Sequence, residues 1–157
     1  MGGETDLDKL IGSMSAELVP GLYVFATVAP GQVPPGLSPR MVFHEAEGTT
    51  LILLKSEAET NGLAYEFPCR MITLNIHSSL EAVGFMARIA TELARHDMGV
   101  NPVSGFYHDH LFVPEDRAED ALRILEKIAE DAAWARMKER VGDDPIYGEL
   151  RKHYLGE

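Results

Sequence analysis

The sequence predicts an α+β fold in which helices cover one face of an antiparallel sheet. Between residues 72 and 77, apolar side chains alternate with polar ones, as in a strand that buries one face. Apolar side chains then recur at helical spacing over residues 80–94, and again over residues 118–132. Two short strand-like segments, residues 100–106 and 110–113, separate these helices. This order of elements allows both helices to pack on the same face of one sheet.

The N-terminal part of the chain predicts one helix, one strand and a long loop. Residues 5–14 place apolar side chains on one face of a short helix. Residues 22–28 are apolar and rich in β-branched and aromatic side chains, which favours a central strand. Residues 29–39 contain four prolines and two glycines, so we expect a loop there rather than a helix.

The next segments connect the two halves of the chain. Residues 41–54 predict a hairpin whose turn lies at residues 46–48. A short helix follows at residues 56–61 and ends at Gly62. Residues 65–69 lead without a linker into the strand that begins at Arg70. We therefore expect the two halves to pack as one body, with their sheets side by side.

A capping box marks the start of the helix that follows this strand. Ser78 and Glu81 have its spacing, which predicts that the helix begins at the serine, and Gly99 follows its end. The predicted apolar stripe consists of Leu80, Val83, Met86, Ala87, Ala90, Leu93 and Ala94. The expected core contacts join Ile72, Leu74 and Ile76 to Val83, Ala87, Ala90 and Leu125.

The C-terminal part predicts a long helix and a tail. After a break at Pro114, the helix runs from residue 116 towards residue 140, and residues 142–145 predict a second break. In the tail, Ile146, Leu150 and Tyr154 are spaced four residues apart and form a short apolar stripe. The tail therefore either docks this stripe on the body or is a frayed terminus.

Composition excludes several classes of function. The formal net charge is −11 and the pI about 4.9, which argues against binding to nucleic acid or to an anionic membrane. No apolar run approaches the length of a transmembrane helix, and an acidic N-terminus is unlike a signal peptide, so we expect a cytoplasmic protein. The single cysteine, Cys69, excludes an internal disulfide, and we expect it to be a small buried apolar residue.

Several motifs give the chain a resemblance to a known family. They are Glu4-Thr5-Asp6-Leu7, Tyr23-Val24-Phe25, Glu45-Ala46-Glu47-Gly48, Phe67-Pro68-Cys69-Arg70, His77-Ser78-Ser79-Leu80-Glu81-Ala82-Val83-Gly84 and Tyr107-His108-Asp109-His110. The chain resembles small, largely uncharacterised proteins made of two tandem ACT-like units over roughly residues 4–130. This resemblance implies ferredoxin-like βαββαβ units: an irregular N-terminal half at residues 1–68, a C-terminal unit at residues 69–133, and a helical tail at residues 134–157.

The strand-to-helix junction is the candidate ligand site. A helix N-terminus presents unpaired N–H groups that suit a carboxylate, and a glycine early in the helix allows a ligand to approach closely. The candidate ligand-binding residues are Ser78, Ser79, Leu80, Glu81, Val83, Gly84, Asn101 and Asp109, with Ser104 and Tyr107 as further polar contacts. ACT regulators bind amino acids at such a junction, against a neighbouring unit. The resemblance therefore implies that Ser79, Leu80, Val83 and Gly84 contact the ligand. The alternative is that Ser78 only caps the helix and Gly84 only packs.

Three histidines suggest a different chemistry. His108 and His110 share one face of a regular strand, and His77 lies on a neighbouring segment, so the three side chains together are a candidate metal site. A polar turn between two strands explains the same residues without a metal, because Asp109 can bond its own turn backbone. We therefore expect no metal and no cofactor.

The sequence favours a non-enzymatic regulatory module that binds an amino acid or a related metabolite. It contains no Walker loop and no GxGxxG, GxSxG, CxxC or HExxH motif. We expect no fused catalytic domain in a chain of this length, so such a module would regulate an enzyme on a separate chain, or none. Two alternatives remain: an assembly module that pairs with another subunit, for example as a homodimer, and a metal-dependent enzyme that uses the three histidines.

Overall fold

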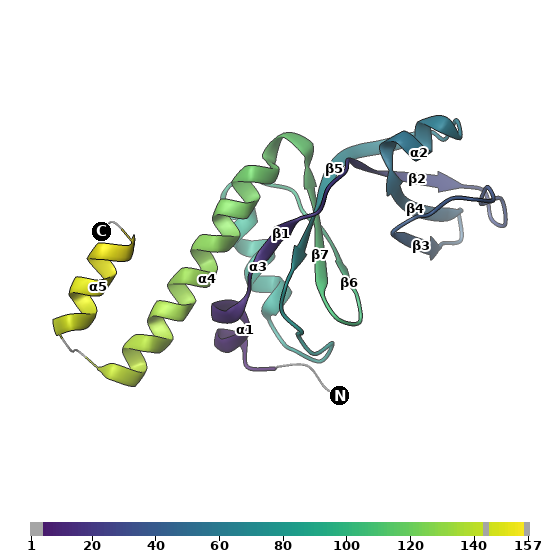
Figure 1. The fold of residues 1–157 in the computed structure, drawn as a ribbon. Helices are drawn as coiled ribbons and strands as arrows, with labels where there is room; N and C mark the ends of the chain where they lie inside the picture. Colours follow the sequence, from purple (N-terminus) through teal and green to yellow (C-terminus); the bar gives the residue numbers. More distant parts are fainter. Residues whose placement is uncertain (1–4, 143–144, 156–157) are drawn as a thin grey trace.

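The computed structural model describes residues 5–142 and 145–155 (Figure 1). The elements in chain order are α1 (Leu7–Ser13), β1 (Ala16–Leu18), β2 (Tyr23–Val28), β3 (Met41–His44), β4 (Thr49–Leu54), α2 (Lys55–Thr60), β5 (Tyr65–Leu74), α3 (Phe85–Arg95), β6 (Asn101–Ser104), β7 (Asp109–Pro114), the 3₁₀ turn η1 (Glu115–Arg117), α4 (Ala118–Val141) and α5 (Pro145–Leu155). The predicted α+β class is confirmed, and so is the loop over residues 29–39.

One antiparallel sheet contains all the strands of the described chain. Its order is β3-β4-β2-β5-β7-β6, and β1 pairs with the end of β5. The strand β5 therefore pairs with two groups of strands. Tyr65–Cys69 pairs with β2, whereas the second half of β5 pairs with β7 on one side and β1 on the other.

This pairing divides the sheet into two four-stranded units that share β5. Unit 1 contains β3, β4, β2 and the first half of β5, together with α2. Unit 2 contains β6, β7, the second half of β5 and β1, and α1 and α4 pack with it. The boundary expected between residues 68 and 69 lies inside β5, and residues 7–18 lie against unit 2 rather than unit 1.

A β-bulge in the middle of β5 bends the sheet between the two units. Tyr23 faces Cys69, but Phe25 faces Glu66, so β5 contains one extra residue there. Phe67 has a left-handed φ of 54°, and Pro68 has no N–H to offer a neighbouring strand. In Figure 1 the strands of unit 1 run in a clearly different direction from β7.

Aromatic side chains pack together at this bend. The ring of Phe25 meets Phe67 at 5.8 Å and Phe112 at 5.7 Å, both edge-on, and these contacts link the two units. Cys69 is fully buried in the same cluster, and its thiol donates to the carbonyl oxygen of Tyr23 at 3.3 Å. Burial raises the pKa of the Cys69 thiol to about 12, so the cysteine is a packed apolar residue as expected.

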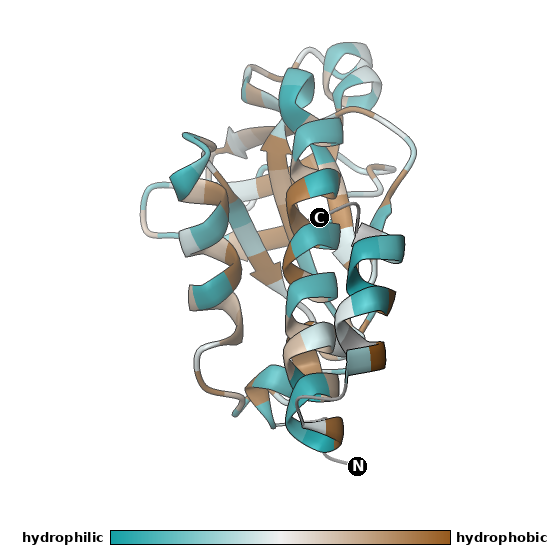
Figure 2. Cartoon of the chain, turned by 90° about the vertical axis from the view of Figure 1, so that its left-hand side faces the viewer, coloured by the Kyte–Doolittle hydropathy of each residue, from teal (hydrophilic) through white to brown (hydrophobic). Residues whose placement is uncertain are grey.

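The largest core lies between the other face of unit 2 and helices α1, α3 and α4, which Figure 2 shows in front of an apolar sheet. Ile72 and Leu74 are fully buried in this core with Leu125 of α4, so the predicted orientation of the strand is confirmed. Ile76 packs at its margin. Thr73 points to the opposite face, where its hydroxyl lies 3.0 Å from Nδ1 of His110.

The predicted start of α3 is wrong, and of its predicted apolar stripe Leu93 is buried and Met86 packs against the core. The helix begins at Phe85, not at Ser78, and Val83 is 85% exposed in the preceding loop. Its buried face is Phe85, Ile89 and Leu93, whereas Ala87 is exposed. The larger side chains occupy the buried positions because burial stabilises the folded state roughly in proportion to the apolar area removed from water.

The C-terminal tail is a helix whose apolar stripe stays exposed. Ile146, Leu150 and Tyr154 are 67%, 40% and 70% exposed, so the docking of this stripe on the body is not observed. The predicted break at residues 142–145 includes two positions, 143 and 144, outside the described residues. Within the described part of the chain, no helix combines the length and apolar character that crossing a membrane requires.

Candidate functional site

The predicted junction is a loop, residues 75–84, that packs against the β6–β7 hairpin. The hydroxyl of Ser78 donates to Asp109 Oδ2 at 3.0 Å, so it does not cap α3. The N–H of Glu81 donates to the hydroxyl of Ser79 at 3.1 Å, which makes a local turn. The predicted capping box between Ser78 and Glu81 is therefore wrong, because a carboxylate on a neighbouring strand engages the serine instead.

Asp109 is the centre of this arrangement. Asp109 is 7% exposed, and it pairs with Leu74 in the β5–β7 ladder. The hydroxyl of Ser104, the last residue of β6, donates to Asp109 Oδ1 at 2.5 Å. Among the described residues, Asp109 has two neutral hydroxyl donors but no ion pair with a lysine or arginine. A buried carboxylate without a counter-cation is costly and favours a bound cationic group.

A small pocket of about 100 Å³ opens beside this carboxylate. Its lining residues are Ser78, Ser79, Leu80, Ala82, Phe85, Met86, Ser104 and Asp109. The pocket thus joins four of the eight candidate residues, and also Ser104, to the first turn of α3. Sequence reasoning missed Ala82, Phe85 and Met86, although the spacing of Phe85, Ile89 and Leu93 was a signal for the true start of the helix.

The other predicted residues lie outside the pocket. Glu81 and Val83 are exposed on the loop. Asn101 pairs with Phe112 at the opposite end of β6 from Ser104, and three residues of strand correspond to about 10 Å. The structure therefore does not bring Asn101 to Asp109.

Gly84 occupies the N-cap position of α3 with a φ of 89°. This left-handed conformation disfavours a side chain, whatever space is available. No side-chain hydrogen bond caps α3 within the described residues. The first N–H groups of the helix, next to Phe85 and Met86 in the pocket wall, are consequently suited to an anionic group.

The three histidines do not converge. His108 Nδ1 lies 3.4 Å from the carbonyl oxygen of Ile76, and the ring of His77 packs against Tyr107 at 5.7 Å. Burial, followed by the nearby His108, lowers the pKa of His110. Over residues 5–142 and 145–155, no group of three or more histidine, cysteine, aspartate or glutamate side chains is placed to hold a metal ion.

Comparison with known proteins identifies the family. Models of the ACT domain match residues 2–70 and residues 66–127. No curated protein is similar enough in sequence to match. A Vibrio cholerae protein of unknown function, described as a possible transport protein, is 42% identical over 80% of this chain and 97% of its own, with a TM-score of 0.72. The chain therefore belongs to the ACT-domain family and contains two ACT domains in tandem.

More distant structures share the fold. An Agrobacterium tumefaciens protein is 15% identical over 74% of this chain and 89% of its own, with a TM-score of 0.60. The regulatory subunit of aspartate kinase from Thermus flavus is 10% identical over 73% of this chain and 96% of its own, with a TM-score of 0.56. ACT domains are regulatory modules, so the two family-model matches support the class of small-molecule-binding regulatory proteins for this chain.

Proposed function

We propose that this protein is a non-enzymatic regulatory module that binds an amino acid, or a closely related metabolite, in the Asp109 pocket. The observation that carries the proposal is a buried carboxylate without a counter-cation, placed beside the uncapped start of a helix. These two features attract opposite charges. An α-amino acid carries an ammonium group and a carboxylate group on the same carbon atom.

The ammonium group of the ligand binds Asp109. The ligand carboxylate accepts hydrogen bonds from N–H groups in the first turn of α3, near Phe85 and Met86. The hydroxyls of Ser78 and Ser104 already hold Asp109 in place, which reduces the ordering cost of binding. The pocket volume of about 100 Å³ suits the charged head of an α-amino acid and leaves the rest of the ligand at the surface.

The ligand side chain then meets the surface around the pocket. Leu80 and Val83 on the loop are 69% and 85% exposed, and Phe106 and Tyr107 on the hairpin turn are 67% and 64% exposed. A second copy of the chain, placed over this surface, would enclose the ligand, as the family resemblance suggests. We propose that ligand binding regulates an enzyme on a separate chain. The cytoplasmic location expected from the sequence stays a prediction.

A thermal-shift screen of the standard amino acids at millimolar concentration tests the proposal. A ligand at 100 times its dissociation constant adds about 2.7 kcal/mol to the free energy of unfolding. We expect Asp109→Asn to abolish the shift, because the amide carries no charge, and Asp116→Asn, an exposed carboxylate on η1, to retain it. Ser79→Ala should weaken binding at little cost in folding, since its hydroxyl only accepts a local turn hydrogen bond.

A screen without any shift would count against the proposal and favour the assembly-module alternative. One observation supports that alternative. The edge strand β3 exposes Val42 and Phe43, at 44% and 60%, and pairs on one side only, with β4. An exposed apolar edge strand is suited to pairing with another chain.

A further inference from the structure

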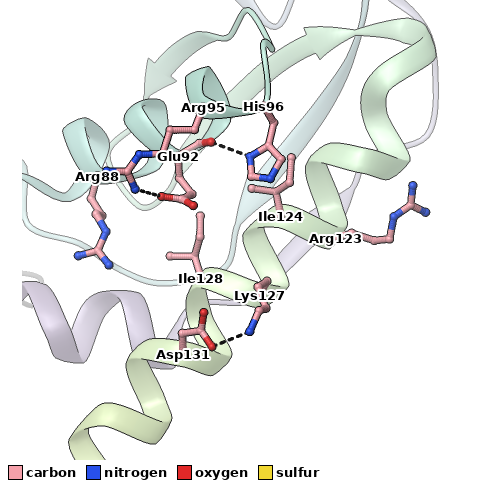
Figure 3. A pocket seen from close by; sticks show the side chains of 9 residues that line it. All are labelled: Arg88, Glu92, Arg95, His96, Arg123, Ile124, Lys127, Ile128 and Asp131. Atoms are coloured by element: carbon pink, nitrogen blue, oxygen red, sulfur yellow. Dashed lines mark hydrogen bonds and ion pairs between the residues drawn. The ribbon is translucent and has the colours of Figure 1, made fainter. Parts of the chain in front are cut away.

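A groove of about 410 Å³ lies between α3 and α4, away from the Asp109 pocket (Figure 3). It exists because α4 packs closely along α1 but approaches α3 at fewer points. The lining residues are Arg88, Glu92, Arg95, His96, Arg123, Ile124, Lys127, Ile128 and Asp131. Ile124 and Ile128 lie between the two helices and form an apolar floor.

The rim of the groove is cationic on a chain that is strongly acidic. Arg88 and Arg95 come from α3, and Arg123 and Lys127 from α4, against two carboxylates, Glu92 and Asp131. The whole chain has 14 lysines and arginines and 25 aspartates and glutamates, so cations are concentrated here against the overall balance. The potential over the groove therefore favours an acidic partner.

The rim cations are exposed, and their ion pairs are weak. Arg88 is exposed and has no ion pair among the described residues. Arg95 pairs with Glu92 at 2.8 Å, and Lys127 with Asp131 at 2.9 Å, but the side chains of these two cations are 68% and 57% exposed. Arg123, 69% exposed, pairs with Asp120. Exposed pairs of this kind contribute about 0–1 kcal/mol, so a partner can compete for these cations.

The cations are spread along the groove rather than gathered at one point. Arg88 and Arg95 are seven residues apart, which is about 10 Å along the helix axis. Figure 3 shows the guanidinium groups of Arg88 and Arg123 at opposite ends, pointing away from each other. A compact anion such as phosphate could contact few of them at once. An extended partner with carboxylates on both flanks could contact all four.

We propose that this groove docks an acidic amphipathic helix of a partner protein. The apolar side of that helix lies on Ile124 and Ile128, and its carboxylates face the cations of α3 on one flank and of α4 on the other. A second copy of the chain would bring the same cationic rim to the groove, and like charges repel. The proposal does not depend on the ligand of the Asp109 pocket.

A fluorescein-labelled synthetic peptide tests the proposal on the full chain. The peptide carries leucine at every third or fourth position and glutamate at the flanking positions, and its anisotropy reports binding. A scrambled peptide of the same composition has the same charge without the apolar stripe. We expect the ordered peptide to bind at micromolar concentration, the scrambled one at least about fivefold more weakly, and binding to weaken as salt rises.

Two double variants separate the groove from the net charge. Arg88→Glu with Arg123→Glu should weaken binding about tenfold or more, because both flanks lose a cation. Lys55→Glu with Lys152→Glu changes the net charge by the same amount on α2 and α5, outside the groove, and should change binding less than about twofold. Melting temperatures of both variants confirm that each is folded.

Five outcomes overturn the proposal. Equal weakening by the two double variants would assign binding to net charge. Equal binding of the scrambled peptide, or no binding at micromolar concentration, would remove the amphipathic helix as the occupant. Displacement of the peptide by phosphate at constant ionic strength would assign the rim to a compact anion. Sedimentation could also detect a dimer of the wild-type chain. If the double variant with Arg88→Glu and Arg123→Glu no longer forms this dimer, the groove is a site of self-association.

Discussion

Each unit of this protein pairs the second strand of a hairpin with the strand that precedes this hairpin in the chain, but the units differ in the segment between that strand and the hairpin. In unit 2 the loop of residues 75–84 and α3 come after β5, whereas in unit 1 a proline-rich loop comes after β2 and no helix forms before β3. Among the described residues, unit 1 consequently has no helix between its first strand, β2, and its hairpin. Backbone pairing is enough to preserve the sheet, but the candidate ligand pocket requires the helix as well.

The hairpins of the two units show the same contrast. The second strand of each hairpin begins with a buried polar residue, which is Thr49 in unit 1 and Asp109 in unit 2. Thr49 lies within 3.2 Å of Nδ1 of His44, the last residue of β3, as Asp109 contacts Ser104 at the end of β6. One position thus carries a neutral group in unit 1 and a charge in unit 2. Equivalent geometry with different charge explains why we place the ligand in unit 2 alone.

The largest expected effect comes from truncating the core of each unit. Leu74→Ala should cost near the upper end of about 2–5 kcal/mol, because Leu74 lies beneath α1, α3 and α4 and the cavity cannot easily collapse. Leu51→Ala, equally buried beneath the single short helix α2, should cost near the lower end. Urea denaturation measures both. A larger loss for Leu51→Ala would contradict the greater rigidity of unit 2.

A smaller effect is expected at the two hairpin positions. Asp109→Ala leaves the hydroxyls of Ser78 and Ser104 without their acceptor and should cost about 1–3 kcal/mol. It should also speed hydrogen exchange in the loop of residues 75–84, since Ser78 anchors that loop to β7. Thr49→Ala should leave this loop unchanged. Equal exchange in the wild type and in Asp109→Ala would show that Asp109 does not hold the loop.

The smallest effect concerns pH and two histidines. The pKa of His110 is lowered in the folded chain, mainly by burial, so protonation favours the unfolded state. Its contribution to stability is present above the unfolded pKa, near 6.5, and is lost as pH falls through the lower folded pKa. We expect His110→Gln to flatten the fall in melting temperature below pH 6.5, relative to the wild type. His44→Gln, at an exposed position of unit 1, serves as the control.

Sequence patterns predicted the parts of this fold that depend on residues close together in the chain. The alternation around Leu74 predicted which face of β5 is buried. The prolines of residues 29–39 predicted a loop rather than a helix. The start of α3 was mispredicted because the partner of Ser78 is Asp109, 31 positions away in the chain, and a capping pattern carries no information about that contact. The pairing of β1 with β5 was missed for the same reason.

The candidate pocket, like the fold, was predicted only in part from the sequence. Ser78, Ser79 and Leu80 were expected with Asp109, and the pocket brings all four together. Asn101 was expected there as well, but the register of β6 with β7 places it at the other end of the strand. Register depends on pairing between strands, so a single strand does not reveal which of its ends reaches the loop.

The sharing of β5 has a consequence for how the protein unfolds. One strand supplies backbone partners to β2 in the first unit and to β1 and β7 in the second. A one-residue slip of β5 would turn its side chains over in both cores at once. The two halves of β5 meet at Cys69, which pairs with Tyr23 of β2 and with Pro114 of β7, so unfolding of either unit removes a strand neighbour from the other. The two ACT domains should lose structure in one cooperative transition, as a small single domain does.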